Sequence, residues 1–572
     1  MLTGVSGPAQ AEPAGGGLGQ PPRPTWRDRR GWRAAAVAAG VVLLFYCAQR
    51  VARQVTVTSD GAGMVLQSWA MLHGNLLLHG WQLADVSFYT TELPEYMLVE
   101  LVRGLNPDVV RICAALTYTL LVVLAAAVAY GARPAGKRTA VVRAAITVAV
   151  MLGPTLLAAT VLLNDPDHTG TAVPVLLVLL VVDRARRRWW VPVLVAGVLG
   201  WALVGDSLVL LIGVAPLVVV CGARSFGLLA LRREPLAVAW RDLSLAAAGL
   251  AAVVVGTVLS ALIKAGGGYL LTPSANQYTV PSTALPANVA ATVNNFLGLF
   301  SADFFAARLN HWLAVTAVHL VFACLVALAL FLALRASGRD FLHGDLIAQL
   351  LAAAIVINLL AYLFLYPGGG STVREIAPVF GLGGALAGRV LAEPLLRRRL
   401  EPLLALGAVA AVAVLLPTVL IVKPPSPATA KLARFLAAHD LRSGLAGYWN
   451  ADSVTLESGG RVVVAPVRFH RGHGLSALPW EIDTRLFDSG ANDANFLVAT
   501  APGAPSSVTQ AEAVALFGPP YRRYVYHGDT IMVWHKNLLS QLPSAQTTWL
   551  DPPVGRNEAA ARPIVGGAAV LR

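Results

Sequence analysis

Four short polar segments carry the side chains in this sequence that could do acid–base or anion-binding chemistry. Asp60 follows an apolar helix after only a few residues, so its carboxylate is expected at a membrane interface, where an isolated charge is costly to keep. A carboxylate can accept the proton of a hydroxyl, and the planar guanidinium of Arg374 can hold two oxygens of a phosphate. The four segments are SDG at 59–61, NDPDH at 164–168, GDS at 205–207 and STVRE at 371–375.

The segment NDPDH supports two interpretations. Asp165, Asp167 and His168 could together hold a divalent cation, because oxygen-rich loops bind such ions. Equally, Asp167 could cap a helix that starts here. Asp206 has the same ambiguity, since it could either turn the chain between two short apolar runs or belong to a site.

The residues that follow Asp60 have apolar side chains at helical spacing, which predicts one or two helices lying along the interface. Further along the same loop, Glu92 and Glu95 flank Pro94 and are expected to face water. The whole connection from Ser59 to Arg111 is therefore predicted to be structured.

Composition predicts that apolar helices position these segments. The chain has 572 residues, of which 56% are hydrophobic and 13% charged, and its mean hydropathy is +0.63. These values are typical of a polytopic membrane protein. The net charge of +13 could suggest nucleic acid, but the arginines cluster in short segments between apolar runs, so we expect no nucleic-acid partner. The four cysteines lie in apolar runs without a CxxC pair, which argues against a thiolate metal site.

About 11 apolar runs predict the transmembrane helices. Several are shorter than the roughly 20 residues that cross a bilayer unaided, which predicts tilted, broken or partly buried helices. Basic residues fall in alternate connections, and the other connections hold the polar segments above, so the positive-inside rule places those segments on the outer face. The runs are 34–52, 112–131, 144–162, 171–183, 190–204, 207–222, 244–264, 311–335, 346–366, 376–393 and 402–422.

The expected domain organisation has four parts. A disordered basic cytoplasmic tail covers 1–33, because it has too few large apolar residues to fold. A transmembrane domain follows over 34–425, then an extracytoplasmic α/β domain over 426–545 and a loose tail over 546–572. Within the α/β domain we expect a first helix ended by Gly444, strands including SVTLESGGRVVVAPV with a Gly-Gly turn, and a hairpin at His527–Asp529. The expected fold class is thus an α-helical polytopic membrane protein with a C-terminal extracytoplasmic α/β domain. The expected location is the plasma membrane, with the N-terminus in the cytoplasm.

In its order of features the chain resembles the GT-C class of membrane glycosyltransferases, which includes the protein O-mannosyltransferases and aminoarabinose transferases. The resemblance covers roughly residues 30–425 and lies in topology and loop placement. It consists of a basic tail, a first helix, an outer loop that opens with an acid, the pattern Trp69-Ala-Met-Leu-His-Gly74, Leu93-Pro94, and Arg111 at the next span.

The resemblance implies transfer of a sugar from a polyprenyl-phosphate donor to a glycan, lipid or protein acceptor on the outer face. Asp60 matches the acid of the class's first loop and would act as the base toward an acceptor hydroxyl. Arg374, with Lys264 behind it, would contact the donor phosphate. Asp165, Asp167 and His168 would contact substrate or a divalent cation; no other cofactor is implied.

One departure from the class keeps other functions open. Several members have an Asp-Glu pair in the first loop, whereas Gly61 follows Asp60 here. The chain could use Asp165 or Asp167 as the second acid, or it could be a catalytically silent scaffold for assembly of the cell envelope. A lipid or sugar transporter is a further alternative, but it predicts charges deep within the helices, and the apolar runs hold almost none between their ends.

Overall fold

The computed structural model describes residues 26–132, 134, 136–164, 168–185, 188–272, 279–304, 311–366, 370–421, 423–424, 427–470, 473–500 and 508–544. Packing divides the chain into two units, Met1–Leu44 and Phe45–Arg572. In the first unit, the described residues form the beginning of the helix α1 (Trp26–Ala52), where Val37 and Val42 are exposed. All other described elements belong to the second unit.

Eight helical segments of the described chain are long and apolar enough to cross a membrane. Apolar side chains on their surfaces are exposed, as expected for helices surrounded by lipid: Leu403, Leu406 and Val409 of α15 (Glu401–Leu420) are each more than 60% exposed. The predicted class of helical polytopic membrane protein is therefore confirmed. The eight segments are Gly31–Ala52, Asp108–Tyr130, Leu210–Leu231, Leu236–Ala265, Trp312–Arg339, Leu346–Leu365, Thr372–Arg397 and Glu401–Leu420.

The three remaining predicted runs form shorter helices. The run at 144–162 is broken, because α5 (Lys137–Val150) ends before Gly153, which has φ +60, and Pro154, and the chain resumes as α6 (Leu156–Leu162). The other two are α7 (Ala172–Ala185) and α8 (Trp190–Gly205). With the eight long segments they account for the eleven runs, so the prediction that several would be short or broken is correct.

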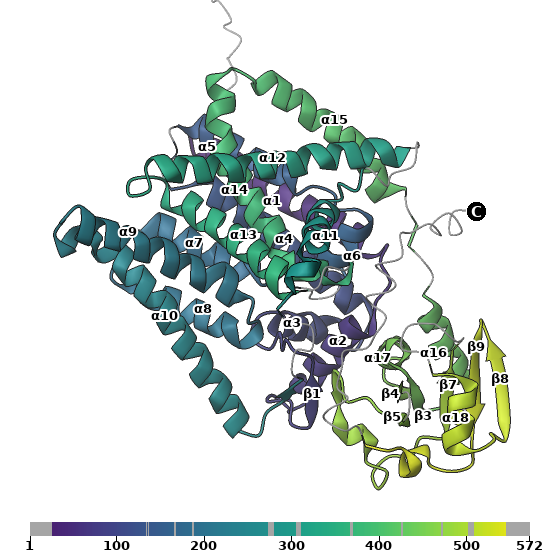
Figure 1. The fold of residues 1–572 in the computed structure, drawn as a ribbon. Coiled ribbons are helices and arrows are strands. Elements are labelled where there is room, and N and C mark those ends of the chain that lie inside the picture. Colours follow the sequence, from purple (N-terminus) through teal and green to yellow (C-terminus); the bar gives the residue numbers. More distant parts are fainter. Residues whose placement is uncertain are drawn as a thin grey trace, which may run out of the picture. The chain divides into compact units, whose positions relative to one another are not determined.

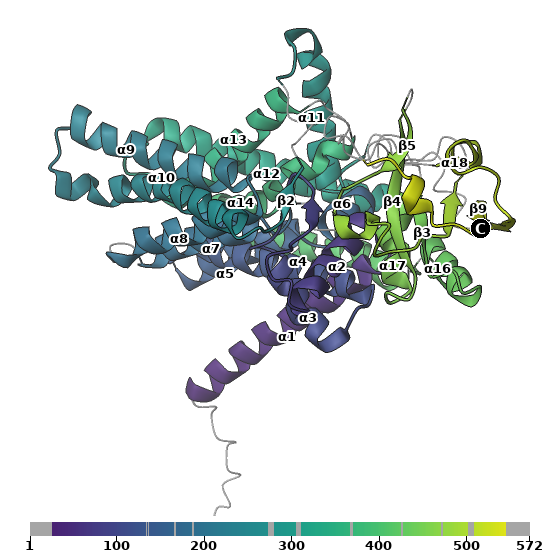
Figure 2. The same ribbon diagram turned by 90° about the horizontal axis from the view of Figure 1, so that it is seen from below.

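Helices of the second unit pack side by side in both views (Figures 1 and 2). Helices α14 and α5 come close at Gly388, where a Cβ would overlap the Arg143 carbonyl and the Thr147 hydroxyl. The other helices are α2 (Ser59–Leu72), α3 (Leu93–Arg103), α4 (Asp108–Tyr130), α9 (Gly222–Phe226), α10 (Leu236–Ala265), α11 (Leu285–Leu299), α12 (His311–Arg339), α13 (Leu346–Leu365) and α14 (Pro378–Arg397), with π-helical turns η1 (Leu210–Val214), η2 (Leu217–Cys221) and η3 (Gly227–Leu231) and 3-10 turns η4 (Ser282–Ala284), η5 (Gly370–Ile376), η6 (Thr484–Phe487) and η7 (Leu538–Gln541).

The C-terminal region is a six-stranded mixed sheet in the order β5-β4-β3-β7-β9-β8, with helices on both faces (Figure 1). Along β7 the side chains alternate between two cores: Phe496 packs with α16 and α17, and Leu497 packs with α18. The elements are α16 (Ala428–Ala438), β3 (Ser443–Gly447), α17 (Tyr448–Glu457), β4 (Val463–His470), β5 (Gly474–Ala477), β7 (Phe496–Ala499), α18 (Gln510–Phe517), β8 (Arg522–Tyr526) and β9 (Asp529–Val533).

Two expectations for this region have different outcomes. The hairpin is confirmed, since β8 and β9 pair through Tyr526 and Asp529 around His527 and Gly528, both with positive φ. The strand predicted for SVTLES is wrong, because these residues form the end of α17. Val454 and Ala451, three positions apart, both face the core, and this helical contact overrides the local β-branched composition.

A second, smaller sheet joins three distant parts of the chain. Strand β1 (Trp81–Leu83) of the first loop pairs in parallel with β2 (Leu270–Leu271), which follows α10. On its other side β1 pairs antiparallel with β6 (Ile482–Asp483) of the C-terminal region. The first loop is therefore fixed on both sides by backbone hydrogen bonds.

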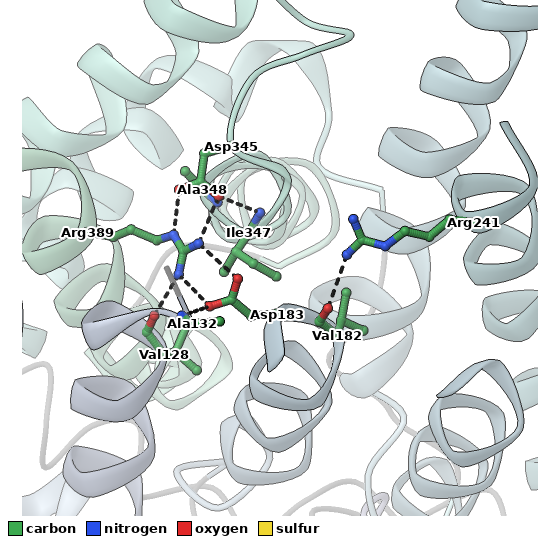
Figure 3. A network of polar contacts seen from close by, with 9 residues as sticks. All are labelled: Val128, Ala132, Val182, Asp183, Arg241, Asp345, Ile347, Ala348 and Arg389. Carbon is green, nitrogen blue, oxygen red and sulfur yellow. Dashed lines mark hydrogen bonds and ion pairs between the residues drawn. The ribbon is translucent and has the colours of Figure 1, made fainter. Parts of the chain in front are cut away.

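A charged network around the buried Arg389 joins elements at the side that the sequence assigns to the cytoplasm. Figure 3 shows Arg389 of α14 contacting Asp183 at the end of α7 (3.2 Å) and Asp345 before α13 (2.6 Å). Its guanidinium also donates to the carbonyl of Val128 near the end of α4 (2.8 Å). His168 and Glu375 precede the opposite ends of α7 and α14, and the side of the membrane on which they lie stays a prediction.

Candidate functional site

Asp60 lies in the first turn of α2, enclosed by the C-terminal region. Thr58 caps the helix, its hydroxyl accepting from the N–H of Gly61. The predicted helix is present, but it does not lie open at an interface, because Met64, Val65 and Met71 are buried against neighbouring elements. Asp60 itself stays partly accessible.

The Asp60 carboxylate faces a second acid across a tyrosine hydroxyl. The hydroxyl of Tyr448, the first residue of α17, lies 2.5 Å from Asp60 Oδ1 and 2.7 Å from Glu481 Oε2. Tyr448 is fully buried, and burial followed by the charges of Asp60 and Glu481 raises the pKa of its phenol well above the usual value. The phenol therefore remains protonated, and its one proton serves two carboxylates.

Neighbouring residues hold both Tyr448 and Glu481 in place. The hydroxyl of Ser59 donates to the backbone carbonyl of Tyr448 at 2.5 Å, which ties α2 to the start of α17. Glu481 stands between the buried residues Trp480 and Ile482 and has φ +54, an uncommon conformation for a residue with a side chain. Pairing of β6 with β1 begins at the next residue and fixes this geometry.

A further acid lies one helical turn beyond Tyr448. Asp452 is fully buried, and within the described chain neither of its carboxylate oxygens has a hydrogen-bond partner. Burial, and after it the charge of Asp60, raises the pKa of Asp452 well above its usual value. Burial without a hydrogen-bond partner therefore favours the protonated form of this carboxyl.

A second polar centre forms where α7, α8 and η5 meet. His168 Nδ1 lies 2.7 Å from Asp206 Oδ2, and its Nε2 lies 3.4 Å from Glu375 Oε2. Burial alone would lower the pKa of His168, but the charges of Asp206 and Glu375 raise it to about 10. Asp206 also accepts from the Thr171 hydroxyl and the Leu208 N–H. The imidazole is thus a buried cation between two carboxylates.

The first loop covers this second centre. The N–H of Phe88 donates to the carbonyl of Gly205 (2.9 Å), and the hydroxyls of Ser87 and Thr90 donate to the carbonyls of Val204 and Trp201. Near the end of the same loop, the side chain of Glu92 is buried, so the loop turns inward there.

The expectation that Glu92 and Glu95 face water is wrong for both. Glu92 is 3% exposed. Glu95 is partly buried, and its Oε2 accepts a hydrogen bond from the Thr117 hydroxyl at 2.8 Å. Burial raises the pKa of Glu92 to about 8 and that of Glu95 to about 7. Instead, Leu98, Leu101 and Val102 of α3 are exposed, so this helix turns its apolar face outward.

Two consecutive residues of the first loop link the two centres. Ala84 packs against Tyr448 and Trp480 beside the first centre. Asp85 is close enough to Glu375 of the second centre for their charges to interact. Because adjacent Cα atoms are about 3.8 Å apart, both centres border one short stretch of chain.

The cationic candidates lie on different elements. Arg374 is in η5 beside Glu375, with Nε 3.6 Å from Glu375 Oε1, and it acts electrostatically on His168. Lys264 is exposed in the last turn of α10, shortly before β2. Asp165 and Asp167 lie outside the described residues, and both ring nitrogens of His168 face carboxylates. Among the described residues, no cluster of three histidine, cysteine or acidic side chains could hold a metal.

Sequence reasoning missed Tyr448, Glu481, Asp452 and Asp85. Nothing local distinguishes these residues, because each gains its meaning from a partner far along the chain. A weak signal was present in PWEID, where Glu481 sits between the apolar residues Trp480 and Ile482, which suit a buried strand. Glu375 was inside a segment that the sequence did single out.

Comparison with known proteins gives few matches. No protein-family model matches the chain, and no curated protein matches it. Among solved structures, it is similar to the crystal structure of ArnT from Cupriavidus metallidurans bound to undecaprenyl phosphate. The TM-score is 0.49 at 15% identity, over 90% of this chain and 99% of that one. We therefore base the proposed function on the chain's own residues and their contacts.

Proposed function

We propose that the protein is a membrane glycosyltransferase that moves a sugar from a polyprenyl-phosphate donor to an acceptor on the extracytoplasmic face. The observation that carries this proposal is the hydroxyl of Tyr448, which lies within hydrogen-bond distance of both Asp60 and Glu481. The hydrogen bond from Tyr448 fixes the Asp60 carboxylate, and Asp60 stays partly accessible. Both properties suit a general base that must reach an acceptor hydroxyl.

Asp60 takes the hydroxyl proton as the acceptor oxygen attacks the anomeric carbon. The bond between that carbon and the phosphate oxygen breaks, and the polyprenyl phosphate leaves with the bonding electrons. A cation stabilises the charge that develops on this phosphate. Arg374 is the proposed contact because it lies in the part of η5 that faces the second centre, and Lys264 is proposed to add a weaker, more distant attraction.

The second centre supports this arrangement by holding Arg374 in place. Glu375 lies between the guanidinium of Arg374 and the imidazolium of His168, so the segment that carries Arg374 is tied to α7 and to Asp206. The helices around both centres expose apolar side chains, which suits a donor whose lipid tail stays in the membrane. A divalent cation at Asp165 and Asp167 remains a prediction, but His168 does not fit the role of a third ligand, because it is protonated and both its ring nitrogens face carboxylates.

The proposal is tested with the purified full-length protein in proteoliposomes and a panel of polyprenyl-phosphate sugars. Asp60→Asn should lower transfer about 10²- to 10⁴-fold, the range that general bases contribute, without changing donor binding. Arg374→Ala should weaken donor binding about tenfold to hundredfold through loss of a charge-assisted hydrogen bond. Arg397→Ala is the matched control, because this arginine lies at the far end of α14 and is 77% exposed.

Other functions predict other outcomes of the same experiment. A scaffold would bind donor in both the wild type and Asp60→Asn but would transfer sugar in neither. A transporter would move labelled donor across the bilayer of the proteoliposome without consuming it. Unchanged donor binding in Arg374→Ala would refute the phosphate assignment alone.

A further inference from the structure

Two carboxylates compete for one phenolic proton at the first centre. Tyr448 can donate to Asp60 or to Glu481 but not to both, although both oxygens lie at short hydrogen-bond distances of 2.5 and 2.7 Å. With one additional proton all contacts are satisfied: a protonated Glu481 donates to the Tyr448 oxygen, and Tyr448 donates to Asp60. Asp60, Tyr448 and Glu481 together can therefore bind one additional proton.

We propose that Glu481 of the C-terminal region supplies the second carboxylate that the first loop lacks, and that it receives through Tyr448 the proton taken up by Asp60. This inference rests on the proposed function and deepens it. Glu481 touches no substrate, so it is a positioning residue that acts through Tyr448. It answers the departure noted in the sequence, where Gly61 follows Asp60.

The proton transfer is balanced without an external reagent. The acceptor O–H bond breaks and its proton joins Asp60 while the acceptor oxygen forms its bond to the anomeric carbon. Asp60 then donates to the Tyr448 oxygen as the phenolic proton passes to Glu481. The phenol keeps one proton throughout, Asp60 returns to its carboxylate form, and Glu481 holds the proton until it exchanges with water.

The backbone gives independent support for a functional role of Glu481. Its φ of +54 costs free energy in a residue with a side chain, and such strain persists where surrounding structure imposes it. The flanking Trp480 and Ile482 are buried, and β6 is hydrogen-bonded to β1. A Cβ at position 63 of α2 would come within 3.4–3.5 Å of Glu481, so α2 passes close to this acid at Gly63.

Other charged groups around this centre come from three packed helices. Asp452 of α17 interacts with Asp60, and Glu100 of α3 is near Ser68 of α2. At the far end of α17, Glu457 interacts with Arg111 of α4. Burial raises the pKa of Glu100 to about 8, so this carboxyl is largely neutral near pH 7, and burial also raises the pKa of Asp452. Glu481 is thus the acid that shares a direct hydrogen-bonded path with Asp60.

The first test compares Glu481→Gln, Tyr448→Phe and their double variant by steady-state transfer across a pH series. Each single variant should lower kcat at least tenfold and alter the pH profile, with little change in KM for the donor. The double variant should be no slower than the slower single one, because both changes interrupt one path. Multiplying losses, or an unchanged pH profile in Glu481→Gln, would overturn the proposal.

Asp440→Asn is the matched control for these variants. Asp440 is also an acid with positive φ in the C-terminal region, and its side chain is 80% exposed in a pair with Arg442. Its replacement should leave kcat and the pH profile unchanged. A loss equal to that of Glu481→Gln would mean that the effect is structural.

A second readout does not depend on transfer. A lipophilic carbodiimide modifies protonated carboxyls, so peptide mass spectrometry across a pH series gives the midpoint for labelling of Glu481 in the full-length protein. In Asp60→Asn this midpoint should move at least about one unit to lower pH, because a neighbouring negative charge is lost. No movement would refute proton sharing. If no donor supports transfer in wild type, the proposed function fails. The labelling midpoint of Glu481 then still shows whether Asp60 and Glu481 share a proton.

Discussion

Replacement of His168 by glutamine should strongly destabilise the protein. The imidazolium stands between Asp206 and Glu375, and the side chains of the three residues are 7%, 0% and 11% exposed. His168→Gln removes the cation and leaves both carboxylates buried. Breaking a buried ion pair by removing one partner costs about 3–5 kcal/mol.

The raised pKa of His168 gives a similar magnitude by a separate route. Its value of about 10 lies roughly 3.5 units above the ordinary 6.5, and at about 1.36 kcal/mol per unit this amounts to about 5 kcal/mol. Because the pKa is raised in the folded state, this stabilisation is complete below pH 6.5 and is lost as the pH rises toward 10. Wild type should therefore lose stability between pH 7 and 10.

Urea unfolding in lipid nanodiscs, followed by pulse proteolysis, measures the change. His168→Gln should be about 3–5 kcal/mol less stable than wild type at pH 7 and should lack most of the alkaline decline. His168→Gln combined with Asp206→Asn should recover part of the loss, since one uncompensated charge is removed. A loss below 1 kcal/mol together with an unchanged alkaline decline would refute this account of the ion pair.

Three further predictions concern other parts of the chain. Asp452→Asn should stabilise the protein at pH 7, because burial raises the pKa of this carboxyl and an amide needs no proton to stay neutral. The raised pKa makes wild type lose stability as the pH rises above the unfolded value of about 4, and an equal pH slope in the variant would contradict this prediction. Gly388→Ala should lower stability by about 1–3 kcal/mol, because the added methyl group would overlap α5. Gly407→Ala is the control and should be neutral, because a methyl group there meets open space. Equal thermal stability of the two variants would show that the close approach of the helices is unimportant. In a cysteine-free background, Ser489→Cys should react with an impermeant maleimide on intact cells and Arg398→Cys only after permeabilisation; the reverse pattern would invert the topology.

The helical part of the fold was predictable because long apolar runs are a local signal. All eleven runs correspond to helical segments, and even the short ones were expected to be broken or partly buried. Local signals also located the β8–β9 hairpin. They failed at SVTLES, where the alternation typical of a strand belongs to α17, because packing of Val454 and Ala451 decides the conformation.

The candidate site was predictable only for residues that interrupt an apolar pattern. Asp60, His168, Asp206 and Arg374 stand at the ends of such runs, so the sequence draws attention to them. Glu92 shows the limit of this reasoning: a charged residue next to a proline suggests water, yet the exposed face of α3 is apolar and Glu92 lies inside.

Glu481 could not be found in this way, since its partner Asp60 is hundreds of residues away and the fold brings them together through Tyr448. The first loop lacks a second acid, but the fold places Glu481 on the same tyrosine hydroxyl as Asp60. A pairing that depends on tertiary contacts leaves no spacing in the sequence.

Sugar transfer by the purified protein, compared between wild type and Asp60→Asn in proteoliposomes, tests the central claim most directly. We predict transfer from at least one polyprenyl-phosphate sugar by wild type and by the Asp440→Asn control. Asp60→Asn should bind the same donor, remain folded and transfer at least about a hundredfold more slowly. Transfer at the wild-type rate by Asp60→Asn would contradict the account.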